Sequence, residues 1–233
     1  MSPLEQLRHV LAQRLPDNED PANPDSVQAM QLVLHLPNQV VATRADYLAA
    51  AGQAVVDVCL DERAITDPIF QEGLLAWYNH RIRKVARRAR NSSWEHVQVL
   101  PGATATVGAA QVRAFVPTAV YQVPQLIKKM QIKGTDLPPD DGLPEPDPQR
   151  GLVLVNKGLG MSLGKAAAQV GHATMLHVAR HEVDLDAGWE VREVEAQVFE
   201  RYLPQAAEFV RDAGFTEVAP NSVTVAAFAK RPW

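Results

Sequence analysis

The chain has 233 residues, of which 46% are hydrophobic and 21% are charged, as in a globular protein with one large or two small domains. No apolar run approaches the roughly 18 residues that a membrane-spanning helix needs, so we expect no membrane partner. The charged start MSPLEQLRHVLAQRL is unlike a secretory signal, and the single cysteine excludes an internal disulfide. These features predict a cytoplasmic protein.

The formal net charge is −4, but the charges are distributed unevenly along the chain. Residues 27–133 contain twelve basic and seven acidic residues, whereas residues 134–149 contain five acidic residues and no basic one. Because local fields attract an anionic partner more than the total charge does, the overall acidity does not exclude nucleic acid.

The first elements in the chain are a helix and a loop. Leucines at helical spacing predict a short amphipathic helix over residues 3–15. The acidic, proline-rich stretch 16–26 is typical of a loop. Residues 1–26 therefore form an N-terminal helix and acidic linker.

Two modules follow, at residues 27–133 and 150–233. In the first we expect a strand, a small-residue helix, one long helix and a strand–loop–strand unit, at 29–36, 43–62, 68–90 and 97–117. In the second we expect a strand, a small-residue helix, a short strand with a short helix and a strand–loop–strand unit, at 150–157, 162–182, 189–204 and 208–229.

The stretch GTDLPPDDGLPEPDPQ, residues 134–149, is rich in proline and acid and predicts an extended, solvated linker between the modules. Because the two modules share their pattern, we interpret the chain as an α/β protein with an internal duplication. Modules of this size have thin cores, so we expect them to pack against each other.

The helix expected at 162–182 carries a polar face. Ser162 can cap its N-terminus, and Lys165, Gln169 and His172 recur at i, i+4 and i+7 among alanines and glycines. A helix start at the end of a strand also favours anionic groups. This geometry is that of a site, although an exposed Lys and Gln with a packed His would give the same pattern.

A phosphate-binding P-loop is the first alternative for the turn before this helix. That motif requires Gly, four residues, and then Gly-Lys-Ser/Thr. Here residue 159 is Leu and Ala166 follows Lys165, so no hydroxyl is placed to bind magnesium, and the sequence disfavours a nucleotide triphosphatase.

The stretch DAGFTEVAPNSVTV, residues 212–225, predicts an acid-bearing turn between two strands. Together with GK-AAQ--HA in the preceding helix, it resembles the second, archaeal- and eukaryotic-type family of peptidyl-tRNA hydrolases. The resemblance implies a mixed β-sheet flanked by helices, with neither metal nor cofactor. It also implies that the partner is peptidyl-tRNA, whose ester bond is hydrolysed to release peptide and tRNA.

The family's site residues map onto this chain one by one. The resemblance implies catalytic roles for Lys165, Gln169, His172 and Asp212 and substrate-binding roles for Thr216, Ser222 and Thr224. Ester hydrolysis needs an activated water and a stabilised oxyanion. We expect His172, oriented by Asp212, to act on the water, and Lys165, with Gln169 or helix-terminal amides, to stabilise the oxyanion.

The chain departs from the family pattern in two ways. The interval from His172 to Asp212 is short, and Asn221 stands where glycine is usual. Aligned on the opening strands, the first module has Arg44 at the position of Lys165, so it is a degenerate copy. Because family members resemble homodimers, one degenerate and one intact copy predict a pseudo-dimer within a single, monomeric chain.

The stretch HRIRKVARRAR, residues 80–90, predicts a cationic helix face that would bind nucleic-acid phosphates. Its basic residues are Arg81, Arg83, Lys84, Arg87, Arg88 and Arg90. A solvated surface helix would have the same composition.

Smaller signals indicate no metal and no further nucleophile. His177 and His181 could ligate a metal, but a third ligand in register is missing. Cys59 lies on an apolar helix face and is expected to pack. The leading function is peptidyl-tRNA hydrolysis; a non-catalytic tRNA- or protein-binding module with the same fold is the alternative, and another hydrolase or transferase is a third.

Overall fold

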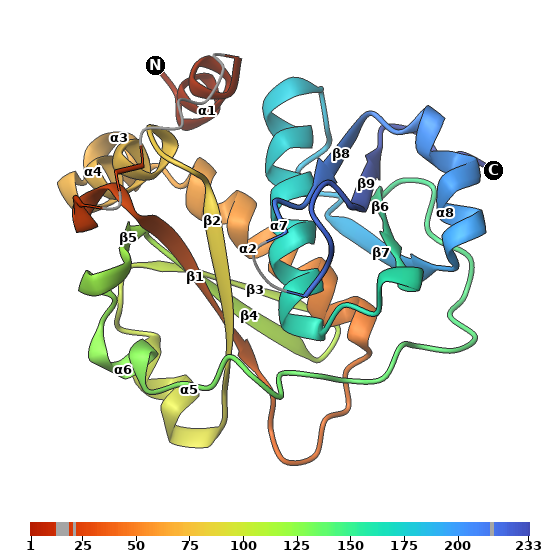
Figure 1. Cartoon of the computed structure of the whole chain (residues 1–233), viewed down its shortest axis with the longest axis horizontal. Coiled ribbons are helices and arrows are strands. Elements are labelled where there is room, and N and C mark those ends of the chain that lie inside the picture. Colours follow the sequence, from red (N-terminus) through yellow and green to blue (C-terminus); the bar gives the residue numbers. More distant parts are fainter. Residues whose placement is uncertain (13–18, 21, 215–216) are drawn as a thin grey trace.

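The computed structural model describes residues 1–12, 19–20, 22–214 and 217–233. It has two mixed β-sheets flanked by helices, which confirms the expected α/β class and suggests two modules (Figure 1). The sheets lie on either side of a central helix pair, α2 (Arg44–Leu60) and α7 (Leu163–Arg180). Within the described residues, no helix is both long and apolar enough to cross a membrane.

The two sheets have the same strand order. The first has the order β2 (Arg83–Ala89), β1 (Gln28–His35), β4 (Ala110–Phe115) and β3 (Gly102–Val107), with β5 (Thr118–Ala119) also paired to β1. The second has the order β7 (Trp189–Val194), β6 (Gly151–Asn156), β9 (Val223–Phe228) and β8 (Glu208–Arg211). In each sheet the first strand in the chain is parallel to the second and antiparallel to the last. A helix, α2 or α7, begins the parallel crossover in each case.

The remaining helices surround the sheets, and three of them pack on the sheet faces opposite the central helix pair. The amphipathic α1 (Pro3–Ala12) buries Leu7 and Leu11, and thus confirms the predicted N-terminal helix within the described residues. The others are α3 (Arg63–Thr66), α4 (Pro68–Tyr78), α5 (Asn91–Val97), α6 (Gln125–Lys128) and α8 (Ala196–Tyr202). Short 3-10 turns occupy Pro24–Ser26, Val120–Gln122, Lys157–Leu159 and Leu203–Gln205.

Glycine allows α2 and α7 to approach each other closely. A Cβ at Gly52 would lie 2.8 Å from the methyl carbon of Thr174, and a Cβ at Gly171 would lie 2.8 Å from a methyl carbon of Val55. Gly52 and Gly171 stand at the same separation from the N-caps of their helices, Thr43 and Ser162. The two contacts are therefore reciprocal.

The prediction of one long helix over 68–90 is wrong. Helix α4 ends at Tyr78, and residues 83–89 form the edge strand β2, parallel to β1. The physical reason is the alternation of burial along the strand, in which Lys84 and Ala86 are buried while the residues beside them are only partly buried. Backbone pairing with β1 outweighed the helical spacing of the arginines.

The prediction for 97–117 is correct only in part. Its last strand is β4, but residues 91–97 form α5, and the Gly/Thr stretch expected to be a loop is the strand β3. Thr104 and Thr106 are β-branched and fit a strand with one exposed face. The other helices and strands expected in the two modules are present.

The linker 134–149 contains neither helix nor strand, as expected, and runs across one end of the molecule (Figure 1). It is not simply solvated, because Thr135 and Pro146 are buried. Two of its acids bind helix N-termini: Asp136 accepts from the backbone N–H of Leu163 at 3.2 Å, and Asp140 accepts from that of Ala45 at 2.6 Å.

Candidate active site

The start of α7 is built by the turn that follows β6. Asn156 ends the strand and accepts a hydrogen bond from the backbone N–H of Gly158, and Gly160 has a left-handed conformation with φ of 59°. Ser162 is the N-cap, as predicted, and its hydroxyl accepts from the backbone N–H of Lys165 at 3.2 Å. The turn thus fixes the position of the first polar side chain of the helix.

A buried polar network joins α7 to the second sheet. The carboxylate of Asp212 forms an ion pair with Lys165 and accepts from the amide of Gln169 at 2.8 Å. The hydroxyl of Thr224 on β9 donates to the Gln169 carbonyl oxygen at 2.8 Å. The exposed fractions are 12% for the Lys165 side chain and 7% for that of Asp212. The structure therefore brings together Lys165, Gln169, Asp212 and Thr224.

The turn after β8 holds the Asp212 carboxylate in place. Its second oxygen accepts from the backbone N–H of Gly214 at 2.8 Å, and its own backbone N–H donates to the carbonyl of Ser222 at 2.9 Å. Ser222 thus supports the turn through its backbone, and Asn221 adopts a left-handed conformation with φ of 66°. Thr216, predicted to bind substrate, lies outside the described residues.

His172 lies on the same face of α7 but has a different partner from the one expected. Its Nδ1 is 3.1 Å from the Nζ of Lys84, which belongs to β2 of the first sheet. Among the described residues, Asp212 makes no hydrogen bond to His172, so the predicted His172–Asp212 pair is replaced by a Lys165–Asp212 pair. Burial and the charges of Lys84 and Lys165 hold the pKa of His172 well below 6.5, so the ring is neutral at physiological pH.

The backbone amides at the start of α7 are already bonded. That of Leu163 donates to Asp136, that of Gly164 to the carbonyl of Thr135 at 3.3 Å, and that of Lys165 to Ser162. The expectation that helix-terminal amides stabilise an oxyanion is therefore wrong, because the linker and the cap use these donors.

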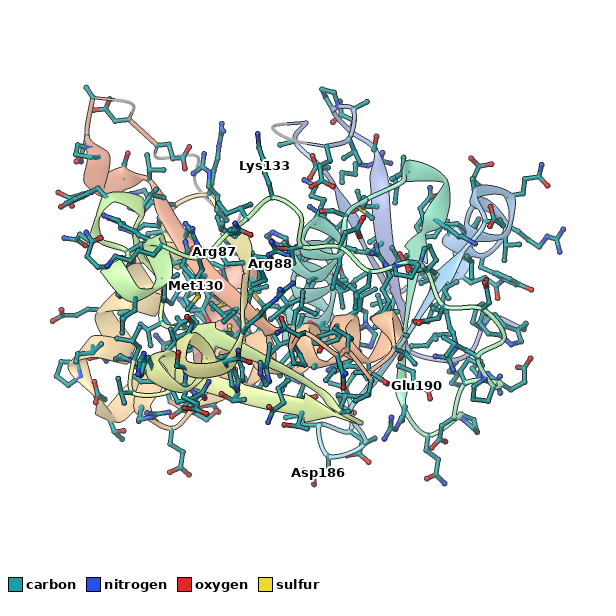
Figure 2. The ribbon with its side chains drawn as sticks, turned by 90° about the horizontal axis from the view of Figure 1, so that it is seen from below. Arg87, Arg88, Met130, Lys133, Asp186 and Glu190 are labelled. Carbon is teal, nitrogen blue, oxygen red and sulfur yellow. The ribbon has the colours of Figure 1, made fainter. Side chains whose placement is uncertain are left out.

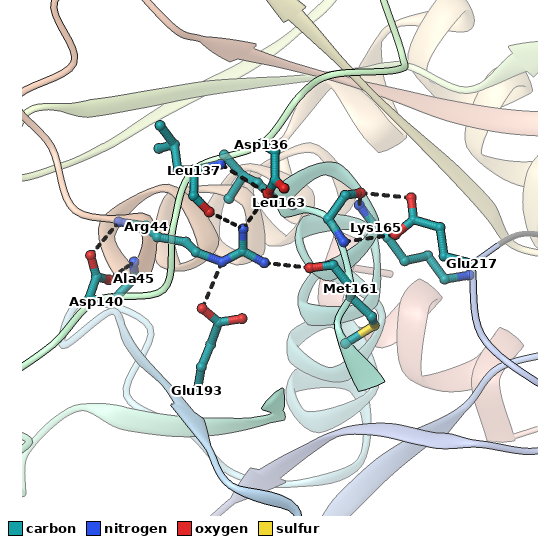
Figure 3. Close-up of polar contacts among 11 residues, drawn as sticks. Arg44, Ala45, Asp136, Leu137, Asp140, Met161, Leu163, Lys165, Glu193 and Glu217 are labelled. Carbon is teal, nitrogen blue, oxygen red and sulfur yellow. Dashed lines mark hydrogen bonds and ion pairs between the residues drawn. The ribbon is translucent and has the colours of Figure 1, made fainter. Parts of the chain in front are cut away.

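Arg44, at the start of α2, is a structural residue (Figure 3). Its guanidinium is 3% exposed and donates to the carboxylates of Glu193 and Asp136 at 2.7 and 2.8 Å. It also donates to the carbonyls of Leu137 and Met161, each at 2.7 Å. Figure 3 shows these bonds converging from the linker, from β7 and from the turn before α7.

The alignment of Arg44 with Lys165 does not hold at the helix caps. Matching Thr43 to Ser162 puts Asp46 at the position of Lys165, and the loop before each helix differs in length. The first module still has no lysine at that position.

Most of the predicted phosphate-binding residues have partners within the chain. Lys84 is buried, and Arg83 pairs with Glu19. Arg81 lies 3.6 Å from the same carboxylate, and Arg87 donates to Gln31 at 2.9 Å.

Arg88 and Arg90 also have partners, since they donate to Gln131 at 3.0 Å and to Asn38 at 3.1 Å, but they line a hollow of about 520 Å³ with His96 and Lys129. Figure 2 shows Arg87 and Arg88 beside Met130 and the side chain of Lys133 pointing away from the ribbon. Since residues 83–89 form an edge strand, the single cationic helix face that we expected over 80–90 does not exist.

The remaining candidates have packing roles. Burial raises the pKa of Cys59 to about 11, so its thiol is not a nucleophile. His177 and His181 stack with ring centroids 4.9 Å apart, and the Nε2 of His181 lies 3.1 Å from Glu208. Among the described residues, no group of three ligands could hold a metal ion.

Sequence reasoning missed Glu217 and the position of Lys84. The carboxylate of Glu217 accepts from both the backbone N–H and the hydroxyl of Ser162, at 2.8 and 2.7 Å, and so ties the Asp212 turn to the helix start. The sequence places Lys84 in a predicted cationic helix, and the basic stretch around it carries no local signal that this side chain faces inward.

The fold and the network define an α/β protein with a buried Lys–Asp–Gln–Thr site at the start of a helix that packs on a mixed sheet. A curated relative, "Peptidyl-tRNA hydrolase" from Aeropyrum pernix, is 33% identical over 103 residues, which cover 34% of this chain and 82% of that protein. The chain therefore belongs to the peptidyl-tRNA hydrolase family. No protein-family model and no solved structure matches the chain.

Proposed function

We propose that this chain hydrolyses the ester bond of peptidyl-tRNA and releases peptide and tRNA, in the cytoplasm where translation takes place. The observation that carries the proposal is the Lys165–Asp212–Gln169 network, since it assembles residue types that ester hydrolysis can use. The similarity to a protein named peptidyl-tRNA hydrolase supports the choice of substrate.

We assign the roles according to the contacts. Asp212 orients the Lys165 ammonium, which keeps further N–H donors for the oxyanion of the tetrahedral intermediate. Thr224 holds Gln169 by its carbonyl oxygen, so the Gln169 amide is directed at the same carboxylate. The neutral His172 activates the water through Nε2, the ring nitrogen that Lys84 does not contact.

The direct test is single-turnover release of an N-blocked aminoacyl group from its tRNA ester. We expect Lys165→Met, Asp212→Asn and His172→Gln each to lower the rate constant by about a hundredfold, in the range of one lost oxyanion donor or one lost base. Lys157→Met is the control, because Lys157 pairs with Glu195 at the surface. Full activity in all three site variants would contradict the proposal.

We further propose that tRNA phosphates bind at the hollow lined by Arg88, Arg90, His96 and Lys129. We expect the double substitution Arg88→Glu with Arg90→Glu to weaken tRNA binding at low salt and to flatten its salt dependence. The control, Arg201→Glu with Lys230→Glu, changes the charge equally at exposed positions of the second module. Equal affinity and salt slope in both variants would exclude this surface.

We also propose that modules 27–133 and 150–233, joined by the linker 134–149, arose by duplication and form a pseudo-dimer. The shared strand order supports this origin, as do the reciprocal contacts of Gly52 and Gly171, which are typical of twofold interfaces. A monomer by light scattering is the expected result, and a stable dimer would contradict it.

A further inference from the structure

Lys84 is a buried base that reaches from the first sheet to a helix of the second module. It lies on β2 and is 9% exposed. Its aliphatic stem crosses α7 at Gly171, where a Cβ would lie 3.3 Å from the Lys84 Cδ. Its Nζ ends 3.1 Å from the Nδ1 of His172.

Within the part of the chain that the structure describes, Lys84 has no counter-charge as a neighbour. Its Nζ lies 4.7 Å from the centre of the Trp77 ring and 3.9 Å from the sulfur of Met175. Besides His172, the titratable group facing it is Cys59 on α2, which lies beside Tyr78 on α4. Burial raises the pKa of both Cys59 and Tyr78, so they remain neutral. Among the described residues, no carboxylate forms an ion pair with Lys84.

Burial lowers the pKa of Lys84 to about 7. The amine therefore exchanges its proton near neutrality, beside an imidazole that stays neutral over the same range. The protonation state of the amine limits the tautomers of the ring. A charged Lys84 can only donate to Nδ1, which places the ring proton on Nε2, whereas a neutral Lys84 can also accept from Nδ1–H and so permits the tautomer in which the Nε2 lone pair is free.

We infer that Lys84 is a positioning residue of the active site, supplied by the first module, and that its hydrogen bond to Nδ1 fixes the orientation and tautomer of His172. The inference rests on the proposed function, because it gives the first module a part in the reaction of the second. Only the state with neutral Lys84 allows Nε2 to act as the base.

A purely structural role for Lys84 predicts that its replacement lowers the melting temperature of the protein. The positioning role predicts the opposite. A buried ammonium without a carboxylate is costly, so Lys84→Met, which keeps the length of the stem, should leave the melting temperature unchanged or raise it. If the lysine is retained for His172, the same variant should lose activity while it remains folded.

The first measurement is nitrogen-15 NMR of the histidine rings between pH 5.5 and 9, with His172 assigned by comparison with His172→Gln. In the wild type we expect the His172 ring to change tautomer near pH 7, as Lys84 loses its proton. In Lys84→Met this step should be absent and the pKa of His172 should rise. The same His172 signals in both proteins would overturn the inference.

The second measurement is turnover of peptidyl-tRNA against pH. We expect kcat of the wild type to rise through pH 7, and Lys84→Met to lose this rise and about tenfold in kcat with little change in KM. Lys133→Met, at an exposed lysine, is the matched control. Wild-type turnover in Lys84→Met would overturn the positioning role.

The two measurements separate this inference from the proposed function. If the wild type fails to hydrolyse peptidyl-tRNA, the proposed function is wrong. The NMR titration then still decides whether Lys84 sets the tautomer of His172, since it needs no substrate.

Discussion

At the scale of single residues, the buried His177 makes the stability of the fold depend on pH. Its side chain is fully buried on α7, and neither ring nitrogen has a hydrogen-bond partner among the described residues. Burial and the neighbouring His181 lower its pKa to about 4, so the folded state holds the ring neutral. The unfolded chain, with an ordinary pKa near 6.5, binds a proton more readily.

We predict that His177 lowers the stability of the fold as the pH falls from about 6.5 to 4. A depressed pKa means that the stabilisation is fully present above pH 6.5 and is lost towards pH 4, by about 3 kcal/mol in total. In His177→Leu, urea unfolding at pH 7.5 and pH 5 should differ less than in the wild type. His96→Gln, at an exposed histidine, should keep the full difference. An unchanged pH dependence in His177→Leu would show that His177 is not responsible.

Only some of the residues of the candidate active site could be identified from the sequence. Lys165, Gln169 and His172 share a helix, so their common face follows from spacing alone. Asp212 is remote in the chain, and its place beside them came from the family resemblance. Lys84 and Glu217 could not be found in this way, because each reaches the site through packing between elements that no local pattern records.

At the scale of elements, the crossing of α2 and α7 depends on two glycines. A branched side chain at Gly52 would meet Thr174 and Val170, the latter 3.2 Å from the added Cβ. We predict that Gly52→Val lowers the free energy of unfolding by about 1–3 kcal/mol, as overpacked cores do. Urea unfolding measures the change, and Gln71→Val on the exposed face of α4 is the control. An equal effect in both variants would contradict the close approach.

Element type was predictable wherever the apolar pattern was strong. The buried strands β1 and β6 and the small-residue helices α2 and α7 follow the sequence closely. Strand β2 does not, because arginines three and four residues apart also fit a helix face. Its identity is set by pairing with β1, which is a tertiary interaction.

At the scale of the whole molecule, Arg44 connects the two sheets through the linker. We predict that Arg44→Met lowers the free energy of unfolding by about 3–5 kcal/mol, since it leaves Glu193, 11% exposed, without its partner. The double variant with Glu193→Gln should recover part of the loss. Arg63→Met, at a guanidinium that is 48% exposed, should cost less than about 1 kcal/mol in the same urea titration. Equal losses at Arg44 and Arg63 would mean that the buried contacts do not hold the sheets together.

The capping carboxylates have a consequence for how the chain could be divided. Asp136 and Asp140 serve the starts of α7 and α2, yet both precede Gly142, whose left-handed turn has no neighbouring atom within 4 Å of an added Cβ. A break in the backbone there would leave Arg44 and both carboxylates on the amino-terminal piece. The carboxyl-terminal piece would keep the amide of Leu163, which donates to Asp136, and the carbonyl of Met161, which accepts from Arg44. The two pieces would thus still have complementary donors and acceptors through which they could associate.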